Sequence, residues 1–341
     1  MELYLDSVDF KEIEAAFKWG VLSGLTTTPT FMHRHGITDI DAAIVKLSGM
    51  VPELQVEALG ETSEEIVKEA HRLLKLPLKS KPVFKIPISN HGVHACRILT
   101  NEGHKVNIHL VYSLNQAYMA MIAGAAYICP LAGRLHDQGH DAFALYKQIV
   151  DVIKNYGFKS KVMVSSVRHP EHIRQGLLTG AHVCTAPWSV IKILSENSLT
   201  ALGTSQFLEH TKLMTVRVKE IIRPHKSSVT LNDTITDAMY IMTESGLGAV
   251  SVVDKDDNLK GIFTDGDLRR YLKETGKKDV LQSKMSDIKF KPPITINADA
   301  LLYNVVNLFK QHQVDSIIVT ENNKPIGFVD IQDLVKMGLI G

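Results

Sequence analysis

The sequence predicts an α/β protein in which about the first 200 residues form a (β/α)8 barrel and the remainder forms a smaller α+β unit. Two observations support this expectation. Short apolar runs of strand type alternate with longer amphipathic runs eight times, and no GxGxxG motif follows the first strand, as a doubly wound dinucleotide-binding sheet would require. Beyond residue 224 a second pattern recurs, because Asp233 and Gly261 align with Asp299 and Gly327 at a constant offset of 66 residues.

The composition is that of a globular protein large enough for two domains: 341 residues, 45% hydrophobic, 22% charged, with a net charge of +1. This balance gives no electrostatic reason to expect nucleic acid or a membrane surface as the main partner. The chain starts without a basic leader, no apolar run reaches about 18 residues, and Cys96, Cys129 and Cys184 cannot all pair. We therefore expect a cytoplasmic protein with free thiols.

Histidines at helical spacing are the pattern most suggestive of a metal site. His91 with His94, and His136 with His140, have a spacing that brings two imidazoles to one helix face. No carboxylate or cysteine is placed by the sequence to complete either set, so we expect no metal.

Eight runs are expected to form the barrel strands. They are Leu3–Leu5, Gly24–Thr26, Leu54–Ala58, Val83–Ile86, Val106–Val111, Tyr127–Cys129, Lys161–Val164 and His182–Thr185. Amphipathic helices are expected between them, for example Asp9–Lys18, Glu64–Leu74, Leu114–Gly124 and Asp141–Tyr156. Ser63 and Ser113 stand immediately before two of these helices and are expected to cap them.

Barrels of this class place their active sites at the carboxyl ends of the strands, where this sequence carries several polar side chains. They are Asp6, Thr26, Thr27, Thr28, Glu57, Lys85, Asn107, His109, Arg134, Ser166 and Arg168. An amine, two carboxylates and two guanidinium groups at one edge suit a phosphorylated carbonyl compound.

Lys85 is the centre of this expectation. Strand alternation places it opposite Phe84 and Ile86, so in a sheet buried on both faces its amine points into a packed interior. Burial disfavours the charged ammonium and leaves an amine that attacks carbonyl carbon. The alternative is a lysine at a strand edge whose amine reaches solvent.

Six segments, in order along the chain, resemble the transaldolase family, including its fructose 6-phosphate aldolase branch. They are Met1–Asp6, Gly24–Pro29, Val83–Pro87, Asn107–Gln116, Gly133–Leu135 and Ser165–Arg168. The resemblance covers about residues 1–212, including a terminal helix that starts near Ser198, and implies a (β/α)8 TIM barrel of transaldolase type.

The resemblance implies a Schiff-base mechanism without a cofactor. Lys85 would attack the ketose carbonyl, Asp6 would take the proton of the C4 hydroxyl, and Glu57 would relay protons through a bound water. For Asp6 and Glu57, the alternative is that they are solvated carboxylates at strand ends.

The substrate positions of the family match a further set of residues. Arg134, Ser166 and Arg168 fall on its phosphate-binding positions, where two guanidinium groups suit a dianion. Surface salt bridges are the alternative for both arginines. Thr26 and Asn107 are expected to face the sugar, Asn107 because it matches an asparagine of true transaldolases that contacts the donor hydroxyls.

Four positions depart from the family pattern, and all lie on the donor and water side. Thr28 replaces an asparagine, His109 a water-holding threonine, Cys129 a serine, and Leu131 a phenylalanine or tyrosine. Either the donor differs from the usual dihydroxyacetone unit or the proton relay is altered. The imidazole of His109 is able to relay protons, since histidine titrates near neutral pH; a packing role is the alternative.

The C-terminal part is expected to contain a linker at residues 213–224, a first repeat at 225–278 and a second at 279–341. Each repeat runs turn, helix, strand, turn, strand and helix, in the first copy with Ile235–Glu244, Ala249–Val253, Gly261–Thr264 and Asp267–Leu272. The pair resembles a CBS-domain pair, an α+β Bateman module. Gly261–Arg270 is similar to the tail of arabinose-5-phosphate isomerases.

The CBS resemblance implies a nucleotide ligand, adenine or other. Thr264 and Asp267 match the threonine and aspartate that contact ribose and phosphate in such modules. In the second copy Asp333 matches, but Asp330 occupies the threonine position, where its carboxylate would repel phosphate. We expect one ligand site rather than two, with a purely structural dimerisation module as the alternative, and a homo-oligomer because both resembled families assemble.

The sequence thus predicts a Schiff-base enzyme that cleaves or transfers a ketol unit of a phosphorylated ketose under control of a nucleotide. Glu57 and Asn107 favour transaldolase over the aldolase branch, and Leu131 leaves this point open. The alternative is a catalytically silent barrel that acts as a sugar-phosphate sensor or scaffold, which Thr28 and His109 favour.

Overall fold

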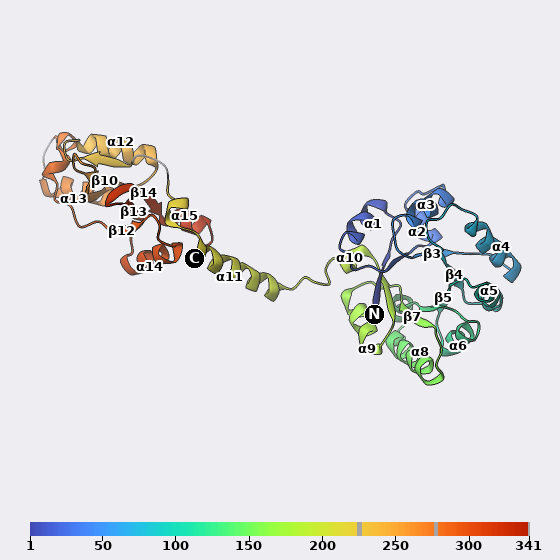
Figure 1. The fold of residues 1–341 in the computed structure, drawn as a ribbon. Helices are drawn as coiled ribbons and strands as arrows, with labels where there is room; N and C mark the ends of the chain where they lie inside the picture. The colour runs from blue at the N-terminus through green and yellow to red at the C-terminus, as the bar shows by residue number, and fades with distance from the viewer. Residues whose placement is uncertain (224–226, 276–278, 340–341) are drawn as a thin grey trace. The chain divides into compact units, whose positions relative to one another are not determined.

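A computed structural model describes residues 1–223, 227–275 and 279–339 (Figure 1). The chain divides into two compact units, Met1–Glu196 and Asn197–Gly341. Helix α11 (Ser198–Thr215) therefore groups with the second unit, whereas the predicted first domain extends to residue 212. The predicted domain limits at 224, 225, 278 and 341 lie outside the described residues.

The first unit is a closed barrel of eight parallel strands in chain order, with β8 returning to pair with β1. The strands are β1 Glu2–Asp6, β2 Gly24–Thr26, β3 Leu54–Glu57, β4 Val83–Pro87, β5 Val106–Val111, β6 Tyr127–Pro130, β7 Lys161–Val164 and β8 Val183–Ala186. All eight predicted strands are confirmed, and their bounds differ from the prediction by no more than one residue.

Ten helices surround the barrel (Figure 1); nine lie between successive strands, and α10 follows β8. They are α1 Phe10–Phe17, α2 Pro29–Arg34, α3 Ile40–Ser48, α4 Ser63–Leu74, α5 Asn90–Asn101, α6 Leu114–Ile122, α7 Ala132–Asp137, α8 Ala142–Tyr156, α9 Pro170–Thr179 and α10 Trp188–Ile191. Ser113 caps α6 as predicted, accepting a hydrogen bond from the Gln116 amide. The predicted cap Ser63 is wrong: Thr62 caps α4, because its hydroxyl and the Glu65 carboxylate form a reciprocal capping box.

The barrel has two apolar layers that fix the direction of each strand side chain. The larger layer lies between strands and helices and contains Phe84 and Ile86, both fully buried. The smaller layer fills the inside of the barrel and contains Tyr4, Val83 and Met163, among others. Because side chains alternate along β4, burying Phe84 and Ile86 against the helices directs Lys85 into the barrel.

The second unit contains two three-stranded sheets, ordered β11-β10-β9 and β12-β13-β14. Its elements are α11, η1 Val218–Glu220, β9 Ser228–Thr230, α12 Ile235–Ser245, β10 Ala249–Val253, β11 Leu259–Thr264, α13 Asp265–Thr275, η2 Val280–Gln282, η3 Met285–Asp287, β12 Thr295–Asn297, α14 Leu302–His312, β13 Ser316–Glu321, β14 Lys324–Asp330 and α15 Ile331–Lys336. The sequence prediction omits the short strands β9 and β12.

The two repeats pack on each other through a small apolar cluster that joins Leu247 and Ala249 to Ile318 and Phe328. Each repeat also has a buried apolar cluster of its own. Gly261 is required by close packing, since a Cβ there would lie 2.5 Å from the Phe290 Cβ.

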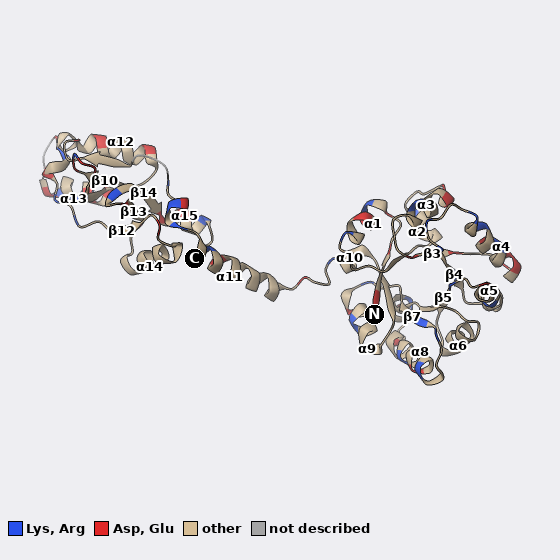
Figure 2. Ribbon diagram, viewed as in Figure 1, with Lys and Arg blue, Asp and Glu red and all other residues tan. Residues whose placement is uncertain are grey.

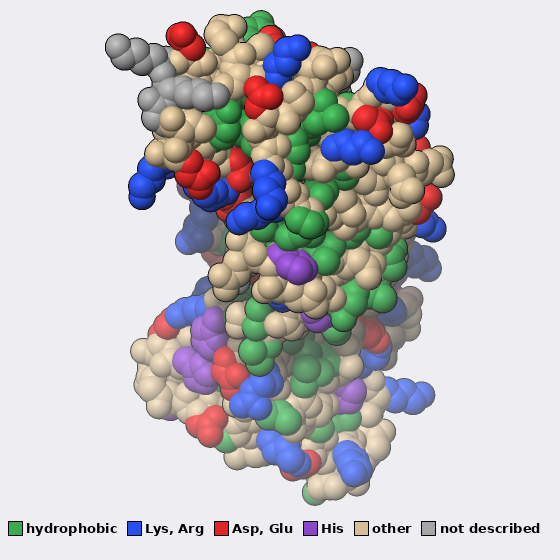
Figure 3. Space-filling model, turned by 90° about the vertical axis from the view of Figure 1, so that its left-hand side faces the viewer, with side chains coloured by type: hydrophobic (Ala, Val, Ile, Leu, Met, Phe, Trp, Pro, Cys, Tyr) green, Lys and Arg blue, Asp and Glu red, His purple; other side chains and the backbone are tan. Residues whose placement is uncertain are grey.

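The surface carries both charges. Figure 2 shows Lys and Arg interspersed with Asp and Glu on the helices of both units, in agreement with the net charge of +1. On the face shown in Figure 3, hydrophobic side chains reach the surface among charged ones. Helix α11 contributes exposed apolar groups such as Leu199 and Phe207. Within the described residues, no helix combines the length and the apolar character needed to cross a bilayer.

Candidate active site and ligand site

A cavity of about 450 Å³ opens at the carboxyl ends of the barrel strands. Its lining includes residues from every strand end and from the segment around α2: Asp6, Thr26, Thr28, Pro29, Thr30, Phe31, Arg34, Glu57, Leu59, Lys85, Pro87, His109, Leu110, Cys129, Leu131, Arg134, Ser165, Ser166 and Thr185. The cavity therefore brings together most of the side chains that the sequence placed at the strand ends.

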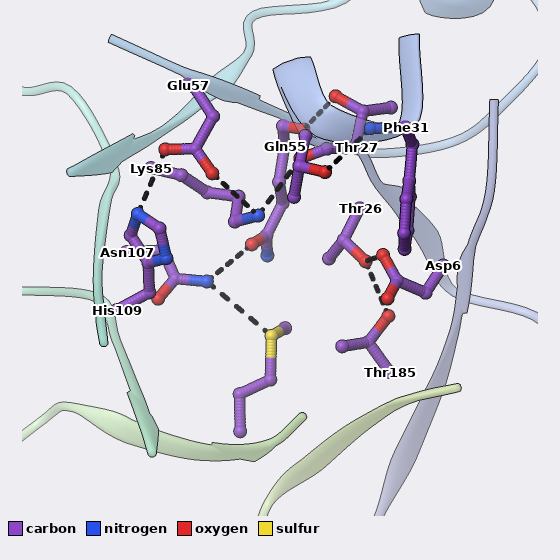
Figure 4. Close-up of polar contacts among 12 residues, drawn as sticks. Asp6, Thr26, Thr27, Phe31, Gln55, Glu57, Lys85, Asn107, His109 and Thr185 are labelled. Carbon is purple, nitrogen blue, oxygen red and sulfur yellow. Dashed lines mark hydrogen bonds and ion pairs between the residues drawn. The ribbon is translucent and has the colours of Figure 1, made fainter. Parts of the chain in front are cut away.

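Lys85 is buried at the wall of this cavity, with 5% of the residue exposed. Its Nζ lies 3.0 Å from Oε1 of Glu57 and donates a hydrogen bond of 2.9 Å to the backbone oxygen of Thr27 (Figure 4). Glu57 and Lys85 are direct partners in the pairing of β3 with β4, which explains why their side chains meet. The buried arrangement, not the solvent-exposed alternative, is observed for this lysine.

Glu57 connects Lys85 to His109. Its second oxygen, Oε2, lies 2.9 Å from Nε2 of His109, so the three side chains form a continuous row across β3, β4 and β5 (Figure 4). Burial raises the pKa of Glu57, but the Lys85 ammonium and the His109 imidazole outweigh it and leave the pKa below its ordinary value.

Asp6 lies on the other side of the cavity from this row (Figure 4). The Thr26 hydroxyl donates to Oδ1 of Asp6 at 2.8 Å, and the hydroxyls of Thr26 and Thr185 are 2.6 Å apart. Burial raises the pKa of Asp6, although the Lys85 ammonium and the hydrogen bond from Thr26 act in the opposite direction. A carboxyl group with a raised pKa is suited to accepting and returning a proton.

Two of the predicted phosphate-binding residues line the cavity. The Arg134 guanidinium donates to the Tyr112 hydroxyl at 3.4 Å, and Ser166 adopts a left-handed backbone with φ of 56°. Because Gly133 has no side chain, the backbone at Ser166 can pack closely against α7; a Cβ at Gly133 would lie 2.4 Å from the Ser166 carbonyl oxygen. The third, Arg168, does not line the cavity; it forms a bidentate ion pair with Asp137.

Of the four departures from the family pattern, His109 is described above, and the other three also line the cavity. The Thr28 hydroxyl lines the cavity and also caps α2, accepting from the Phe31 amide at 3.3 Å. Cys129 is buried, and burial raises the pKa of its thiol to about 11, so it remains protonated at neutral pH. Leu131 presents an apolar wall next to it.

Asn107 does not line the cavity. It is fully buried, its amide nitrogen donates to Oε1 of Gln55 at 2.6 Å, and the same nitrogen lies 3.5 Å from Sδ of Met163 (Figure 4). The amide therefore links β3 to β5 across the inside of the barrel, below the cavity floor.

Sequence reasoning missed several cavity residues. Thr185 lies in the predicted last strand, but the sequence did not indicate it as a site residue. Phe31 and Arg34 belong to the short helix α2, which the sequence did not predict. Gln55, the partner of Asn107 below the cavity, was also missed, although it precedes Glu57 by two residues and therefore shares its strand face.

The four histidines considered for a metal site, His91, His94, His136 and His140, lie outside this cavity. His94 Nδ1 lies 3.1 Å from the Ser63 hydroxyl, and His136 Nδ1 lies 3.1 Å from Nε2 of His172. Across the described residues, no group of three His, Cys, Asp or Glu side chains is placed to hold a metal ion.

A second cavity, of about 520 Å³, lies between the two repeats of the C-terminal unit. Thr264 and Asp267 line it: the Thr264 hydroxyl donates to Asp267 at 2.6 Å, and Arg270 forms an ion pair with the same carboxylate. Asp330 from the second repeat lines the same cavity, together with Lys291.

Asp333, the counterpart of Asp267, is in a different environment. The Arg223 guanidinium holds it through two hydrogen bonds of 2.8 and 2.9 Å, and Asp333 does not line the second cavity. Within the described residues, the position related to Thr264 and Asp267 by the internal repeat is therefore occupied by an ion pair internal to the chain.

Comparisons with known proteins agree with this architecture. The family model described as transaldolase/fructose-6-phosphate aldolase matches residues 3–239, and the CBS domain model matches residues 218–274 and 285–339. A probable transaldolase from Dehalococcoides mccartyi is 36% identical over 214 residues, which are 62% of this chain and 98% of that protein. One from Coprothermobacter proteolyticus is 36% identical over 208 residues, 61% of this chain and 95% of that protein.

Among solved structures, the CBS domain of a CBS-domain-containing membrane protein from Sphaerobacter thermophilus covers 40% of this chain and 96% of its own, with 19% identity and a TM-score of 0.35. That likeness is too weak to add to the argument. The similarity of the tail to arabinose-5-phosphate isomerases stays a prediction. The family matches and the closed barrel agree: the chain belongs to the transaldolase/fructose-6-phosphate aldolase family and carries a pair of CBS domains.

Proposed function

We propose that this protein forms a Schiff base between Lys85 and a phosphorylated ketose and then cleaves or transfers the ketol unit. The observation that carries the proposal is the buried amine of Lys85, in contact with Glu57 and facing a cavity lined with the other polar groups that the reaction uses. A buried amine beside a group that accepts and returns protons is the arrangement that nucleophilic catalysis by lysine needs.

The first step joins enzyme and substrate. The Lys85 ammonium first gives a proton to the Glu57 carboxylate 3.0 Å away. The resulting neutral amine attacks the C2 carbonyl carbon, and the carbinolamine that forms loses its oxygen as water to leave an iminium ion. Glu57 donates the proton that water formation requires and is recharged through His109, whose Nε2 is 2.9 Å away. In this proposal His109 takes over the role of the family threonine that holds water.

The second step breaks the C3–C4 bond. Asp6 accepts the proton of the C4 hydroxyl, the C3–C4 electron pair moves toward the iminium nitrogen, and an aldehyde leaves while an enamine remains on Lys85. The raised pKa of Asp6, caused mainly by burial, favours this proton transfer. Transfer of the enamine to a second aldehyde gives a transaldolase, and its protonation and hydrolysis give a lyase.

The substrate phosphate is assigned to Arg134 and Ser166, which line the cavity at the ends of β6 and β7. Arg168 is proposed as a further phosphate ligand; to bind, its guanidinium has to exchange the Asp137 carboxylate for the phosphate. No cofactor enters this mechanism.

The CBS pair is proposed to bind a nucleotide at the cavity lined by Thr264 and Asp267 and to regulate the barrel. The Arg223–Asp333 ion pair at the related position supports one ligand site rather than two. We further propose that the protein is a cytoplasmic homo-oligomer; three free, buried cysteines fit a reducing compartment.

Borohydride trapping tests the proposal. The protein is incubated with fructose 6-phosphate or sedoheptulose 7-phosphate, reduced, digested and analysed by mass spectrometry. We expect an adduct on the peptide that contains Lys85, its loss in Lys85→Met, and its retention in Lys105→Met, a control lysine that pairs with Glu53.

Absence of any adduct, while a control transaldolase is trapped in parallel, would contradict the proposal and favour the sensor or scaffold. Release of glyceraldehyde 3-phosphate from fructose 6-phosphate without an acceptor aldehyde distinguishes the lyase from the transferase. Titration with AMP and ATP, followed by turnover and oligomer size, tests the CBS site.

A further inference from the structure

We propose that Arg34 forms a second anion-binding subsite opposite Arg134, so that the cavity takes a phosphorylated ketose or keto acid with another anionic group at its carbonyl end. The inference rests on the proposed function, in which Lys85 receives the carbonyl carbon and Arg134 the phosphate. It extends that function by naming the class of substrate.

The barrel topology places the two arginines on opposite sides of the same cavity. Arg34 ends α2, which follows β2, and Arg134 lies in α7, which follows β6. In a closed barrel of eight strands in chain order, β2 and β6 are four positions apart in both directions and so lie across from each other. Lys85 on β4 lies halfway between them.

In the described part of the chain, the ion pairs of the cavity leave the guanidinium groups of Arg34 and Arg134 free for a ligand. Among the described residues, no group forms a hydrogen bond or ion pair with the Arg34 guanidinium, and the Arg134 guanidinium hydrogen-bonds to the Tyr112 hydroxyl alone. The cavity carboxylates have other partners: Glu57 contacts Lys85 and His109, and Asp6 contacts Thr26. Both guanidinium groups are therefore available to a ligand.

The α2 side of the lining consists of Thr28, Pro29, Thr30, Phe31 and Arg34, and of these only Arg34 carries a charge. The Thr28 hydroxyl accepts the capping hydrogen bond of α2, and Phe31 and Pro29 are apolar. A substrate with its phosphate at Arg134 and its carbonyl at Lys85 directs its remaining end toward this side. There a carboxylate or phosphate would meet the guanidinium group of Arg34, which binds such groups in a bidentate manner.

Three substrates test the subsite: fructose 6-phosphate, fructose 1,6-bisphosphate, and 2-keto-3-deoxy-6-phosphogluconate. They share a phosphate at C6 and carry a hydroxymethyl group, a phosphate and a carboxylate, respectively, at the carbonyl end. Half-saturating concentrations for borohydride trapping are measured for the wild type, Arg34→Gln, Arg34→Lys and the control Arg97→Gln on α5.

We expect at least one doubly anionic substrate to be trapped at a concentration about 10-fold or more below that of fructose 6-phosphate. Arg34→Gln removes this preference, Arg34→Lys retains part of it, and Arg97→Gln does not change it. Preference for the bisphosphate or for the keto acid identifies which anion the subsite takes. Equal effects of Arg34→Gln on all three substrates, or no preference in the wild type, would overturn the inference.

A binding measurement separates this inference from the Schiff-base proposal. Lys85→Met cannot form an imine, so calorimetric binding of the same two doubly anionic compounds to Lys85→Met and to Lys85→Met/Arg34→Gln reports the subsite alone. Binding that depends on Arg34 supports the subsite even if no adduct forms on Lys85 in the wild type. Binding that does not depend on Arg34 excludes it.

Discussion

Replacing Glu57 by glutamine removes the carboxylate that contacts Nζ of Lys85 at 3.0 Å and Nε2 of His109 at 2.9 Å. The amide has nearly the same shape, but it carries no charge and cannot transfer a proton between the two neighbours. The substitution therefore tests the row of three side chains without creating a cavity.

The expected magnitudes follow from the geometry. At an effective dielectric constant of 20, unit charges 3.0 Å apart interact by about 5.5 kcal/mol, and desolvation of the pair opposes part of this. We expect Glu57→Gln to lower the free energy of unfolding by about 3 kcal/mol, because it leaves the Lys85 ammonium buried without its anion. Loss of the proton relay should slow formation of the imine by about 10²- to 10³-fold.

Two assays read these effects separately. Urea unfolding of the full chain, followed by tryptophan fluorescence, reports the barrel, because both tryptophans, Trp19 and Trp188, lie in the first unit and their rings are 4.7 Å apart. Quenching with borohydride at increasing times gives the rate of imine formation. His109→Thr serves as a comparison, since it restores the family residue while keeping Glu57 and Lys85.

The reasoning is refuted if Glu57→Gln forms the imine within threefold of the wild-type rate and unfolds at the same urea concentration. Slower trapping without a change in stability would show that the carboxylate acts as a relay and contributes little to holding Lys85.

Two further predictions concern pH. Asp6 acts as a base only when ionised, and its pKa is raised by burial, so the cleavage rate should fall with decreasing pH through a midpoint above the ordinary aspartate value of 3.8. Asp6→Asn should slow cleavage by about 10²- to 10⁴-fold and still permit trapping on Lys85; aldehyde release by Asp6→Asn within tenfold of the wild type would exclude Asp6 as the base. His172 is buried beside His169, His136 and Arg168, and burial lowers its pKa from 6.5 to about 4. The unfolded chain therefore binds a proton between these values that the folded chain does not, so stability decreases as the pH falls through this window, by up to about 3 kcal/mol at 1.36 kcal/mol per pKa unit. In urea unfolding, His172→Gln should lose less stability than the wild type between pH 7 and pH 5, and equal losses would contradict this account.

The positions of the barrel strands were predictable from the sequence because each strand is short, apolar and buried on both faces. The same alternation predicted that Lys85 points opposite Phe84 and Ile86, and the structure agrees. The prediction of helix caps from the sequence was less reliable where two adjacent hydroxyl residues could each cap the helix. At the start of α4, Thr62 and not Ser63 is the cap, because Thr62 is three residues before the Glu65 that completes the box.

Contacts across strands depend on the register of the sheet, which a single sequence does not contain. Glu57 meets Lys85 because those residues are paired between β3 and β4. His109 reaches the same carboxylate from the end of β5, where Leu110 adopts a left-handed backbone with φ of 59° and the register shifts. Asn107 was expected at the substrate, and its pairing with Gln55 below the cavity floor became visible only in the fold.

By itself, then, the sequence determined the barrel, the repeated C-terminal unit and the identity of the polar side chains at the strand ends, since these follow from periodicity and order along the chain. Only the tertiary structure decided which of them share a cavity and which are already paired. Arg168 with Asp137 and Arg223 with Asp333 are bound within the chain, whereas Arg34 is unpaired in the described structure and lines the cavity. The physical reason is that a charged side chain is available to a ligand only if no closer opposite charge has been folded against it, and that depends on three-dimensional distance.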